Sequence, residues 1–426
     1  KPYGKWGYGY YPVGYGDYLM AYLGSTPARA PLSSAQIEDG TIATIDLAAG
    51  AVTTAKITDA NVTTAKIADA NVTAAKVSSD VSQLGKNLIQ NGAMTVAQRG
   101  VNATILSGFD STTNSYIADR FLASGGGTPQ NRADLKHVSS GGPTGFPNFI
   151  RYDITTAESA VAAGESSIIQ QRIEGFNLQS IQAASGVVAL TLQFYMRSPK
   201  TGTHCVYLST QSTRNVVKEF TVAVADTWEK HTLSFVADTS GGTVSNAATE
   251  FLRVGWPIIA GSTYQGTADS WTASNIFATS NQQNLADNTA NNIDITGVQL
   301  EVGSVATDFE NEAISVTLAK CWRYFRLQDF TSMRVYGGTY DVNANAATGA
   351  ITFPVQMRAA PTIAFNGTYQ LVRSGAVTDT SVGHGASYVD SSWCMFFWTS
   401  GSLAENGWYG LMRQSGTCNI TYAADL

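Results

Sequence analysis

Hydrophobic residues in the segment 35–79 return every five positions. Nine aliphatic side chains keep this register, and Ala or Gly stands two places before each of them except Leu47, where Ile45 takes that place. An α-helix turns by about 100° per residue, so a step of five scatters these side chains around it, and in a strand an odd step alternates faces. The period therefore predicts a repetitive fibrous segment, here called the shaft.

Three structures are compatible with the shaft pattern. In the first, several identical chains pack their rows of aliphatic side chains around a common axis. A single chain can instead wind into a pentapeptide β-helix, a pattern matched at 60–62 and 70–72, although the pentads would complete only about two coils. A flexible linker is the third possibility, but linkers do not keep an aliphatic residue in register. We favour the shared axis, and its candidate residues are Ile42, Leu47, Val52, Ile57, Val62, Ile67, Val72 and Val77.

Apolar runs bounded by turn residues follow the shaft, which ends near residue 85. Their spacing predicts a two-layer antiparallel β-sandwich over residues 86–312. Strands are expected at 168–173, 186–196, 205–209, 216–224, 228–236, 251–256 and 293–301.

A second β-rich domain, here called the tip, is expected over residues 313–426. Residues 314–325 place apolar side chains on one helical face and predict a short linking helix. Strands are expected at 333–340, 350–355, 362–365, 369–372, 392–399, 407–413 and 417–422.

The first 34 residues are rich in Gly and Tyr. Their glycines disfavour a regular helix, and a segment of this length could hardly bury its own rings. We expect it to attach to a partner by its aromatic side chains, with a disordered low-complexity tail as the alternative. The contact candidates are Trp6, Tyr8, Tyr10, Tyr11, Tyr15 and Tyr18.

Composition narrows the classes of function. Charged residues make up 14% of the chain, the net charge is -6, and no basic cluster stands out, so we expect no nucleic-acid partner. No apolar run approaches the roughly 20 residues that span a bilayer, so we expect no membrane insertion. Neither the Cys nor the His residues have zinc spacing, so no metal or cofactor is expected. Isolated buried thiols are expected, with Cys394 and Cys418 as the best disulfide candidate.

Three charged residues, Asp119, Arg120 and Glu174, stand among apolar neighbours. A bidentate Arg–carboxylate pair would satisfy charges that are costly to bury alone. A catalytic role would require a His or a second carboxylate at a recognisable spacing, which the neighbouring sequence lacks. We therefore expect a structural pair.

Aromatic residues are dense in the tip. Rings that stack on sugar faces, with Asn or Asp nearby to hold hydroxyls, are what a glycan site needs. In the run 393–398 both faces of the expected strand are apolar, which predicts burial on both sides. Loop residues are therefore the better receptor candidates, and they are His384, Tyr388, Asp390, Trp408 and Tyr409.

Several short motifs occur in a fixed order along the chain. They are NLIQNG at 87–92, QRG at 98–100, ADRF at 118–121, QRIE at 171–174, TGVQLEVGS at 296–304, ATDFE at 306–310, LAKCWRYF at 318–325 and FPVQMRAAPTI at 353–363. Together with the shaft pentads, this set resembles bacteriophage tail fibres that carry a carbohydrate-binding-module-like β-sandwich.

The resemblance implies a homotrimeric external appendage of a virion, assembled in the host cytoplasm. Residues 1–34 would then contact another virion structural protein, and the distal domains would bind a host-surface glycan or protein. The expected fold class is all-β: an extended trimeric fibrous shaft followed by two β-sandwich, jelly-roll-like domains and one short linking helix. We expect no enzymatic activity, because the acidic residues are scattered and a glycan depolymerase needs paired carboxylates. A depolymerase, a structural fibre without receptor binding and a secreted adhesin are the alternatives.

Overall fold

The computed structural model describes residues 37, 40–53, 56–57, 85–100, 102–105, 115–116, 118–127, 132–184, 186–210, 214–329, 335–337, 340–341, 346–373, 376–379, 383–399 and 409–426. The chain divides into two compact units, Lys1–Val77 and Ser78–Leu426. Several candidates from the sequence lie outside the described residues, namely Trp6, Tyr8, Tyr10, Tyr11, Tyr15, Tyr18, Val62, Ile67, Val72, Val77 and Trp408.

Turns repeat every five residues in the described part of the first unit. Amide-to-carbonyl hydrogen bonds of 2.9 Å join Asp46 to Ala43, Ala51 to Ala48 and Lys56 to Thr53. The first of these turns is the 3-10 helix η2 (Thr44–Asp46). Residues 40–53 and 56–57 contain no strand. The axis candidates among them are exposed within the chain, with Ile42 at 53%, Leu47 at 45%, Val52 at 54% and Ile57 at 43%.

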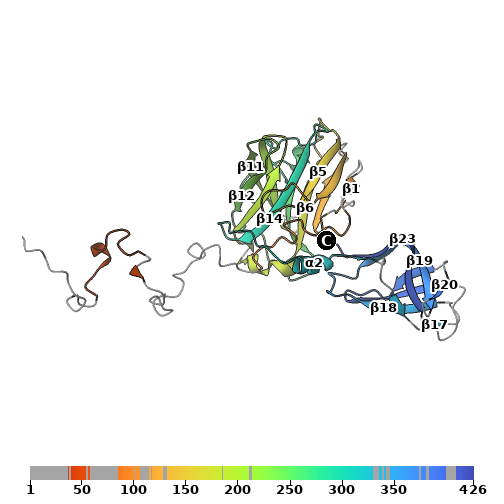
Figure 1. Ribbon diagram of the computed structural model, residues 1–426. Helices are drawn as coiled ribbons and strands as arrows, with labels where there is room; N and C mark the ends of the chain where they lie inside the picture. The colour runs from red at the N-terminus through yellow and green to blue at the C-terminus, as the bar shows by residue number, and fades with distance from the viewer. Residues whose placement is uncertain are drawn as a thin grey trace, which may run out of the picture. The chain divides into compact units, whose positions relative to one another are not determined.

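Two six-stranded antiparallel sheets form the first sandwich (Figure 1). Sheet A has the order β1 (Asn102–Ile105), β4 (Arg132–Val138), β5 (Phe149–Thr156), β14 (Asn292–Val302), β9 (Leu190–Arg197) and β12 (Glu229–Phe235). Sheet B has the order β11 (Arg214–Val222), β10 (Gly202–Thr210), β13 (Glu250–Ala260), β6 (Ser166–Glu174), β3 (Phe121–Gly126) and β2 (Ser115–Tyr116). Shorter elements complete it: η6 (Gly175–Ile181), the pair β7 (Gln182–Ala183) and β8 (Gly186–Val187), and η7 (Ser262–Tyr264).

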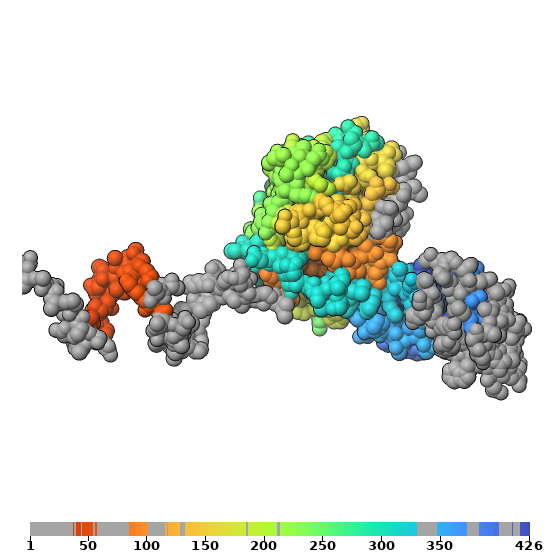
Figure 2. All heavy atoms as spheres, viewed as in Figure 1, coloured from red at the N-terminus to blue at the C-terminus, as the bar shows by residue number. Residues whose placement is uncertain are grey.

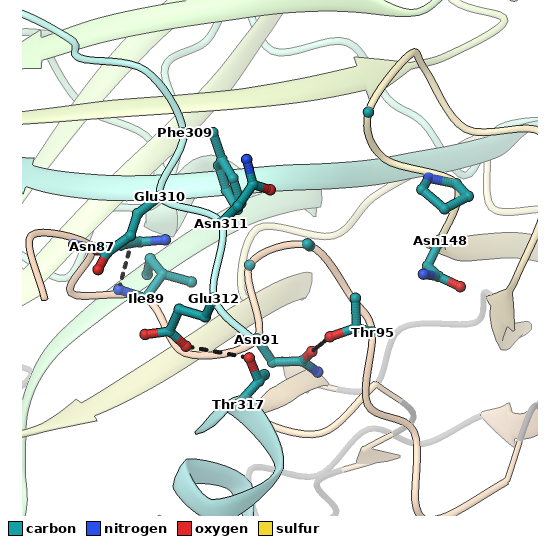
Figure 3. Close-up of a pocket in the computed structure, with 14 residues that line it drawn as sticks. Asn87, Ile89, Asn91, Thr95, Asn148, Phe309, Glu310, Asn311, Glu312 and Thr317 are labelled. Carbon is teal, nitrogen blue, oxygen red and sulfur yellow. Dashed lines mark hydrogen bonds between the residues drawn. The ribbon is translucent and has the colours of Figure 1, made fainter. Parts of the chain in front are cut away.

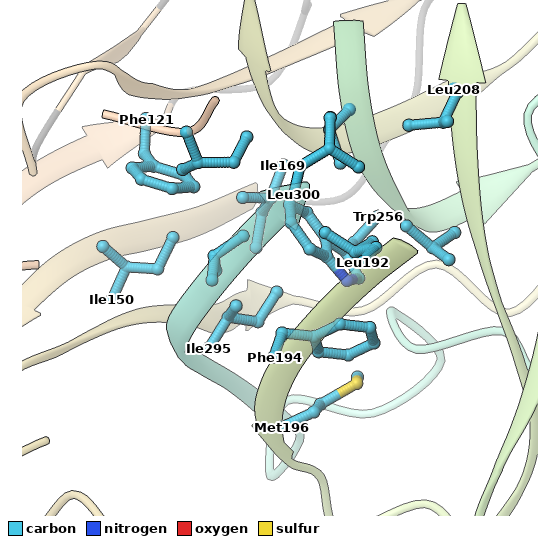
Figure 4. Close-up of a cluster of buried hydrophobic side chains, with 14 of the residues drawn as sticks. Phe121, Ile150, Ile169, Leu192, Phe194, Met196, Leu208, Trp256, Ile295 and Leu300 are labelled. Carbon is cyan, nitrogen blue, oxygen red and sulfur yellow. The ribbon is translucent and has the colours of Figure 1, made fainter. Parts of the chain in front are cut away.

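The core of this sandwich lies between the two sheets. Strand alternation turns Leu192, Phe194 and Met196 of β9 inward, where the Phe194 ring lies 5.4 Å from that of Trp256 in sheet B (Figure 4). Each such fully buried side chain contributes roughly 1.5–3 kcal/mol to stability. The same alternation turns Gln193 and its polar neighbours to the outer face of sheet A.

Each sheet also has a covered outer face. Against sheet B, Tyr207 packs with Ile276 and Phe277 from the segment that follows η7. Against sheet A, the segment 303–312, here called the strap, runs back over β14 and β9 and covers them with polar contacts: the Gln193 side chain of β9 donates to the Thr307 carbonyl over 2.6 Å. Figure 2 shows the residues that open the domain, in orange, beside residues 303–322, in teal.

Helix α2 (Ile314–Trp322) leads into the tip, which is a second sandwich. Its sheet C has the order β15 (Phe325–Asp329), β23 (Tyr409–Ala423), β19 (Thr362–Arg373) and β20 (Ala376–Asp379), and β16 (Val335–Gly337) also pairs with β23. Its sheet D has the order β17 (Tyr340–Asp341), β18 (Ala346–Thr352), β22 (Trp393–Thr399) and β21 (Gly383–Ser387). Phe396, Trp398, Leu371 and Tyr422 meet in the core between these sheets. The all-β prediction with two sandwiches and one linking helix is confirmed.

Several predicted boundaries were wrong. The expected strands at 362–365 and 369–372 are one strand, β19, because Gly367 (φ +101°) and the register shifts beside it accommodate a bulge. The strands expected at 407–413 and 417–422 are likewise the single strand β23. The strand expected at 350–355 is β18, which ends before Phe353, and the helix ends at Trp322 instead of residue 325.

Within one chain, the run 393–398 is buried on one face only, and burial of its other face against a neighbouring subunit stays a prediction. Cys394, Phe396 and Trp398 are fully buried, whereas Trp393 on the opposite face is 37% exposed. Alternation therefore gives this strand one core face and one face that is partly open to solvent. All four cysteines are buried free thiols, so the Cys394–Cys418 disulfide is absent. Among the described residues, no helix could cross a membrane and no cluster of His, Cys, Asp and Glu could hold a metal ion.

Candidate functional site

Two adjoining hollows open on the first sandwich. One lies between the segment 87–95, the loop 139–148 and the strap, and the other lies between the outer face of sheet A, the same loop and the strap. Their cavity volumes are about 140 Å³ and 230 Å³, and both are lined by Gly145, Phe309 and Asn311. Because they share these residues, the two hollows adjoin each other, and together they are here called the sandwich groove.

Three aromatic rings from separate segments line the groove. Phe146 comes from the loop 139–148, Tyr195 from the outer face of β9, and Phe309 from the strap. The Phe146 ring lies 5.4 Å from that of Tyr195 and meets that of Phe309 edge to face at 4.7 Å. Tyr195 and Phe309 are half-buried, so the cluster keeps apolar ring surface open toward the groove.

Gly297 in β14 makes room for these rings. Its φ of +61° is a left-handed conformation, and it sits at the register shift between Thr296 and Gln299. A Cβ at this position would lie 2.9 Å from the Tyr195 ring. The bulge and the missing side chain together set the position of the aromatic cluster.

Buried polar residues of β14 hold the strap in place. Glu301 accepts from the Thr307 amide (2.8 Å) and hydroxyl (2.6 Å), and Gln299 accepts from the Glu310 amide (2.7 Å). The Glu310 carboxylate in turn accepts from the Asn87 amide over 2.8 Å. Satisfied hydrogen bonds of this kind fix a wall that would otherwise be an irregular surface segment.

Uncommitted polar side chains face the groove as well. Figure 3 shows Asn311 on the strap and Asn148 on the loop at opposite sides of it. Within the described part of the chain, neither of these side chains, nor that of Lys230 beside Tyr195, has a hydrogen-bond partner. Amides and an ammonium group can each bind hydroxyl groups of a ligand.

The carboxylates that line the groove are mostly engaged. Glu310 is bound by backbone amides, and Glu312 accepts from the Thr317 hydroxyl (3.2 Å) and pairs with Lys320. Asp308 is exposed on the strap. A groove with flat rings, free amides and one available carboxylate can hold a polar ring-shaped ligand, but it lacks the free carboxylate pair of a glycoside hydrolase.

The receptor candidates in the tip have different environments. His384 of β21 packs on the rings of Phe365 (4.8 Å) and Tyr369 (5.0 Å) and is half-buried. Tyr388 is 72% exposed and has a left-handed backbone (φ +50°). The Asp390 carboxylate accepts from the Ser392 amide and hydroxyl, and these hydrogen bonds lower its pKa. Tyr409 opens β23.

The groove was not among the sequence-based candidates. Its three rings come from segments about 50 and 110 residues apart, and no local motif joins them. The alternation in β9 that turns Tyr195 outward was a usable signal, and so was the glycine of the TGVQ motif. The structure thus defines an all-β protein with two sandwiches and a groove on the first.

No protein-family model and no curated protein matches the chain. Among solved structures, it is similar to the enzymatically active domain of tailspike protein 4 from bacteriophage CBA120, with 11% identity, a TM-score of 0.26, and coverage of 51% of this chain and 22% of that one. It is also similar to a putative sugar binding protein from Bacteroides thetaiotaomicron (11% identity, TM-score 0.27, 51% and 100% coverage). A third likeness is to the CBM22-1–GH10 modules of xylanase 10B from Clostridium thermocellum (11% identity, TM-score 0.24, 51% and 29% coverage). At these TM-scores the likenesses do not bear on what the chain binds.

Proposed function

We propose that the protein is a fibre protein of a virion and that its sandwich groove binds a host-surface glycan. The observation that carries the glycan proposal is the groove itself: Phe309 and Asn311 line both of its hollows, Tyr195 lines one of them, and Asn148 lines the other. Sugars have apolar faces that stack on such rings and hydroxyls that such amides bind. The fibre proposal is supported by the shaft pentads and by the order of the motifs that follow them.

The exposed aliphatic residues of the shaft support a homotrimer. Ile42, Leu47, Val52 and Ile57 recur with the turns and stay uncovered within one chain. Rows of exposed aliphatic side chains favour association, because burial of apolar area is worth roughly 25 cal/mol per Å². Three copies around the shaft axis would cover these rows, and residues 1–34 would attach the assembly to another virion protein.

Three linked copies would also explain how a shallow groove achieves useful binding. Linking weak sites raises the apparent affinity by about 10²–10⁴ without any new contact. A virion with several fibres would multiply this gain. Light scattering on the full chain tests the assembly: we expect three times the mass of one chain, and a stable monomer at micromolar concentration would contradict it.

Glycan binding by the groove is tested with the full chain on an array of bacterial surface glycans, followed by calorimetric titration of the bound ones. We expect binding, and at least a tenfold loss of affinity in Tyr195→Ala and in Phe309→Ala. Phe176→Ala is the matched control, because this ring is 48% exposed on η6 and does not line the groove. Absence of binding to every glycan, or equal binding by all three variants, would refute the proposal.

We propose a binding protein and not a depolymerase, because Glu310 and Glu312 are already engaged by hydrogen bonds or an ion pair. Paired catalytic carboxylates must be free to donate and accept protons or to attack the sugar. Release of reducing ends from host polysaccharide by the purified chain would overturn this choice.

A further inference from the structure

Four of the sequence motifs meet at one place that the groove does not use. Residues of QRG, ADRF and QRIE in the first sandwich contact residues of LAKCWRYF, which opens the tip. This contact region is here called the junction. Motifs that lie far apart in sequence thus share a single structural task.

Glu174 is the centre of the junction. Its side chain is 1% exposed and accepts from Arg323 Nε (2.5 Å) and Nη2 (2.9 Å) and from the Tyr324 hydroxyl (2.9 Å). The bidentate pair expected from the sequence therefore exists, but its arginine is Arg323 of the tip and not Arg120. Removing one partner of such a pair leaves a buried charge without compensation.

The other contacts enclose this pair. Gln98 donates to the Phe325 carbonyl (2.9 Å) and accepts from the Trp322 indole (3.1 Å). The Arg120 guanidinium lies 3.4 Å from the centre of the Tyr324 ring, and its backbone has a left-handed φ of +77°. A non-glycine residue persists in that conformation only where surrounding contacts determine it.

Residues 356–358 lie between Arg323 and the tip hairpin 388–393 and contact both. Its carbonyl accepts from the Arg358 amide over 2.8 Å. Residues 356 and 357 next to this contact bind Ser391: the Met357 amide donates to the Ser391 carbonyl (2.7 Å), and the Gln356 side chain donates to the Ser391 hydroxyl (3.2 Å). Hydrogen bonds on either side of the backbone of residues 357–358 therefore connect Glu174 with the hairpin.

The hairpin presents two exposed rings on a fixed backbone. Tyr388 is 72% exposed with φ +50°, and Trp393 is 37% exposed. The Asp390 amide donates to the Trp393 carbonyl over 2.9 Å and closes the turn. Exposed rings on a strained, hydrogen-bonded loop are arranged for contact with a second molecule.

We propose that Arg323 is a positioning residue that fixes the hairpin relative to the groove-bearing sandwich. The hairpin and the groove would then form one rigid unit that binds a single receptor. The use for receptor binding rests on the proposed function, whereas the rigidity does not. A rigid arrangement lowers the entropy lost when two contacts bind together. The junction thereby gives the four motifs a role in recognition without any contact to the ligand.

Pulsed electron–electron distance measurements test the rigidity in the full chain. Spin labels are placed at Val224→Cys and Tyr388→Cys, both exposed, while the native thiols are buried. Co-expression with excess chain that lacks the new cysteines leaves one labelled copy per assembly. We expect one narrow distance distribution, and at least a twofold wider one in Arg323→Ala. Lys136→Ala is the control, because it removes an ion pair with Asp153 that lies within sheet A and does not join the tip.

A second variant covers the case in which Arg323→Ala fails to fold. Glu174→Gln keeps the shape of the side chain and removes its charge, and circular dichroism confirms folding. We expect it to widen the distribution as well. A broad distribution in the parent chain, or unchanged width in every folded variant of the pair, overturns the proposal. Because no ligand is present, failure of glycan binding leaves this result intact and refutes only the proposed function.

Discussion

Substitution of Gly297 by Ala tests whether the bulge in β14 sets the groove. At φ +61° a residue with a Cβ pays about 1–2 kcal/mol of backbone strain. The new Cβ would also lie 2.9 Å from the Tyr195 ring and 3.3 Å from that of Phe146, which forces the rings to move and adds about 1–3 kcal/mol. We expect the free energy of unfolding to fall by about 2–5 kcal/mol.

Two matched glycines separate strain from the clash. Gly242 has φ +80° with nothing within 4 Å of a built Cβ, so its Ala variant should lose only about 1–2 kcal/mol. Gly164 has open space and no positive φ, and its Ala variant should be neutral or slightly stabilised. Urea denaturation of the full chain, followed by tryptophan fluorescence, measures the stability of all three variants. Glycan titration should show at least a tenfold loss of affinity only in the Gly297 variant. Equal losses of stability at Gly297 and Gly242 would refute the claim that the rings are held against this glycine.

Three further outcomes are expected. Burial lowers the pKa of His204 and His231 below their ordinary value of 6.5. The unfolded chain therefore binds more protons, and the stability that these residues contribute is present above pH 6.5 and lost as the pH falls below it. The urea midpoint should be lower at pH 5.5 than at pH 7.5. A double variant with Gln in place of both histidines should reduce this dependence of the midpoint on pH. Trp256→Ala should cost about 3–5 kcal/mol in urea denaturation, against at most about 0.5 for the exposed Val224→Ala. Val62→Asp should abolish the trimer in light scattering, because a charge on a shared apolar axis is costly to bury. The near-ultraviolet dichroism of the tip should persist. A trimer of Val62→Asp would contradict the shaft prediction.

The sequence was informative where burial follows a simple alternation. The runs around Leu192 and Ile295 face a core on one side, and both were predicted as strands. Strand β3 was not predicted, because FLASGG ends in glycines that disfavour a strand and are tolerated here by pairing with β6. Partners far apart in sequence could not be assigned from the sequence. Glu174 was expected to pair with Arg120, yet it pairs with Arg323, 149 residues away, because the chain fold brings the tip against β6.

The segment 87–91 connects the groove wall to the junction. The Asn87 amide binds Glu310 of the strap (2.8 Å), and the amide and carbonyl of Gln90 bind the Gln171 side chain (2.8 and 2.9 Å). Gln171 begins the QRIE motif, which carries Glu174 three residues later on the same strand. Because these partly buried hydrogen bonds join the segment to both the strap and β6, movement of this segment would disturb both surfaces together. The NLIQNG motif is therefore explained by its contacts with the strap and with the QRIE motif, and not by contact with a ligand.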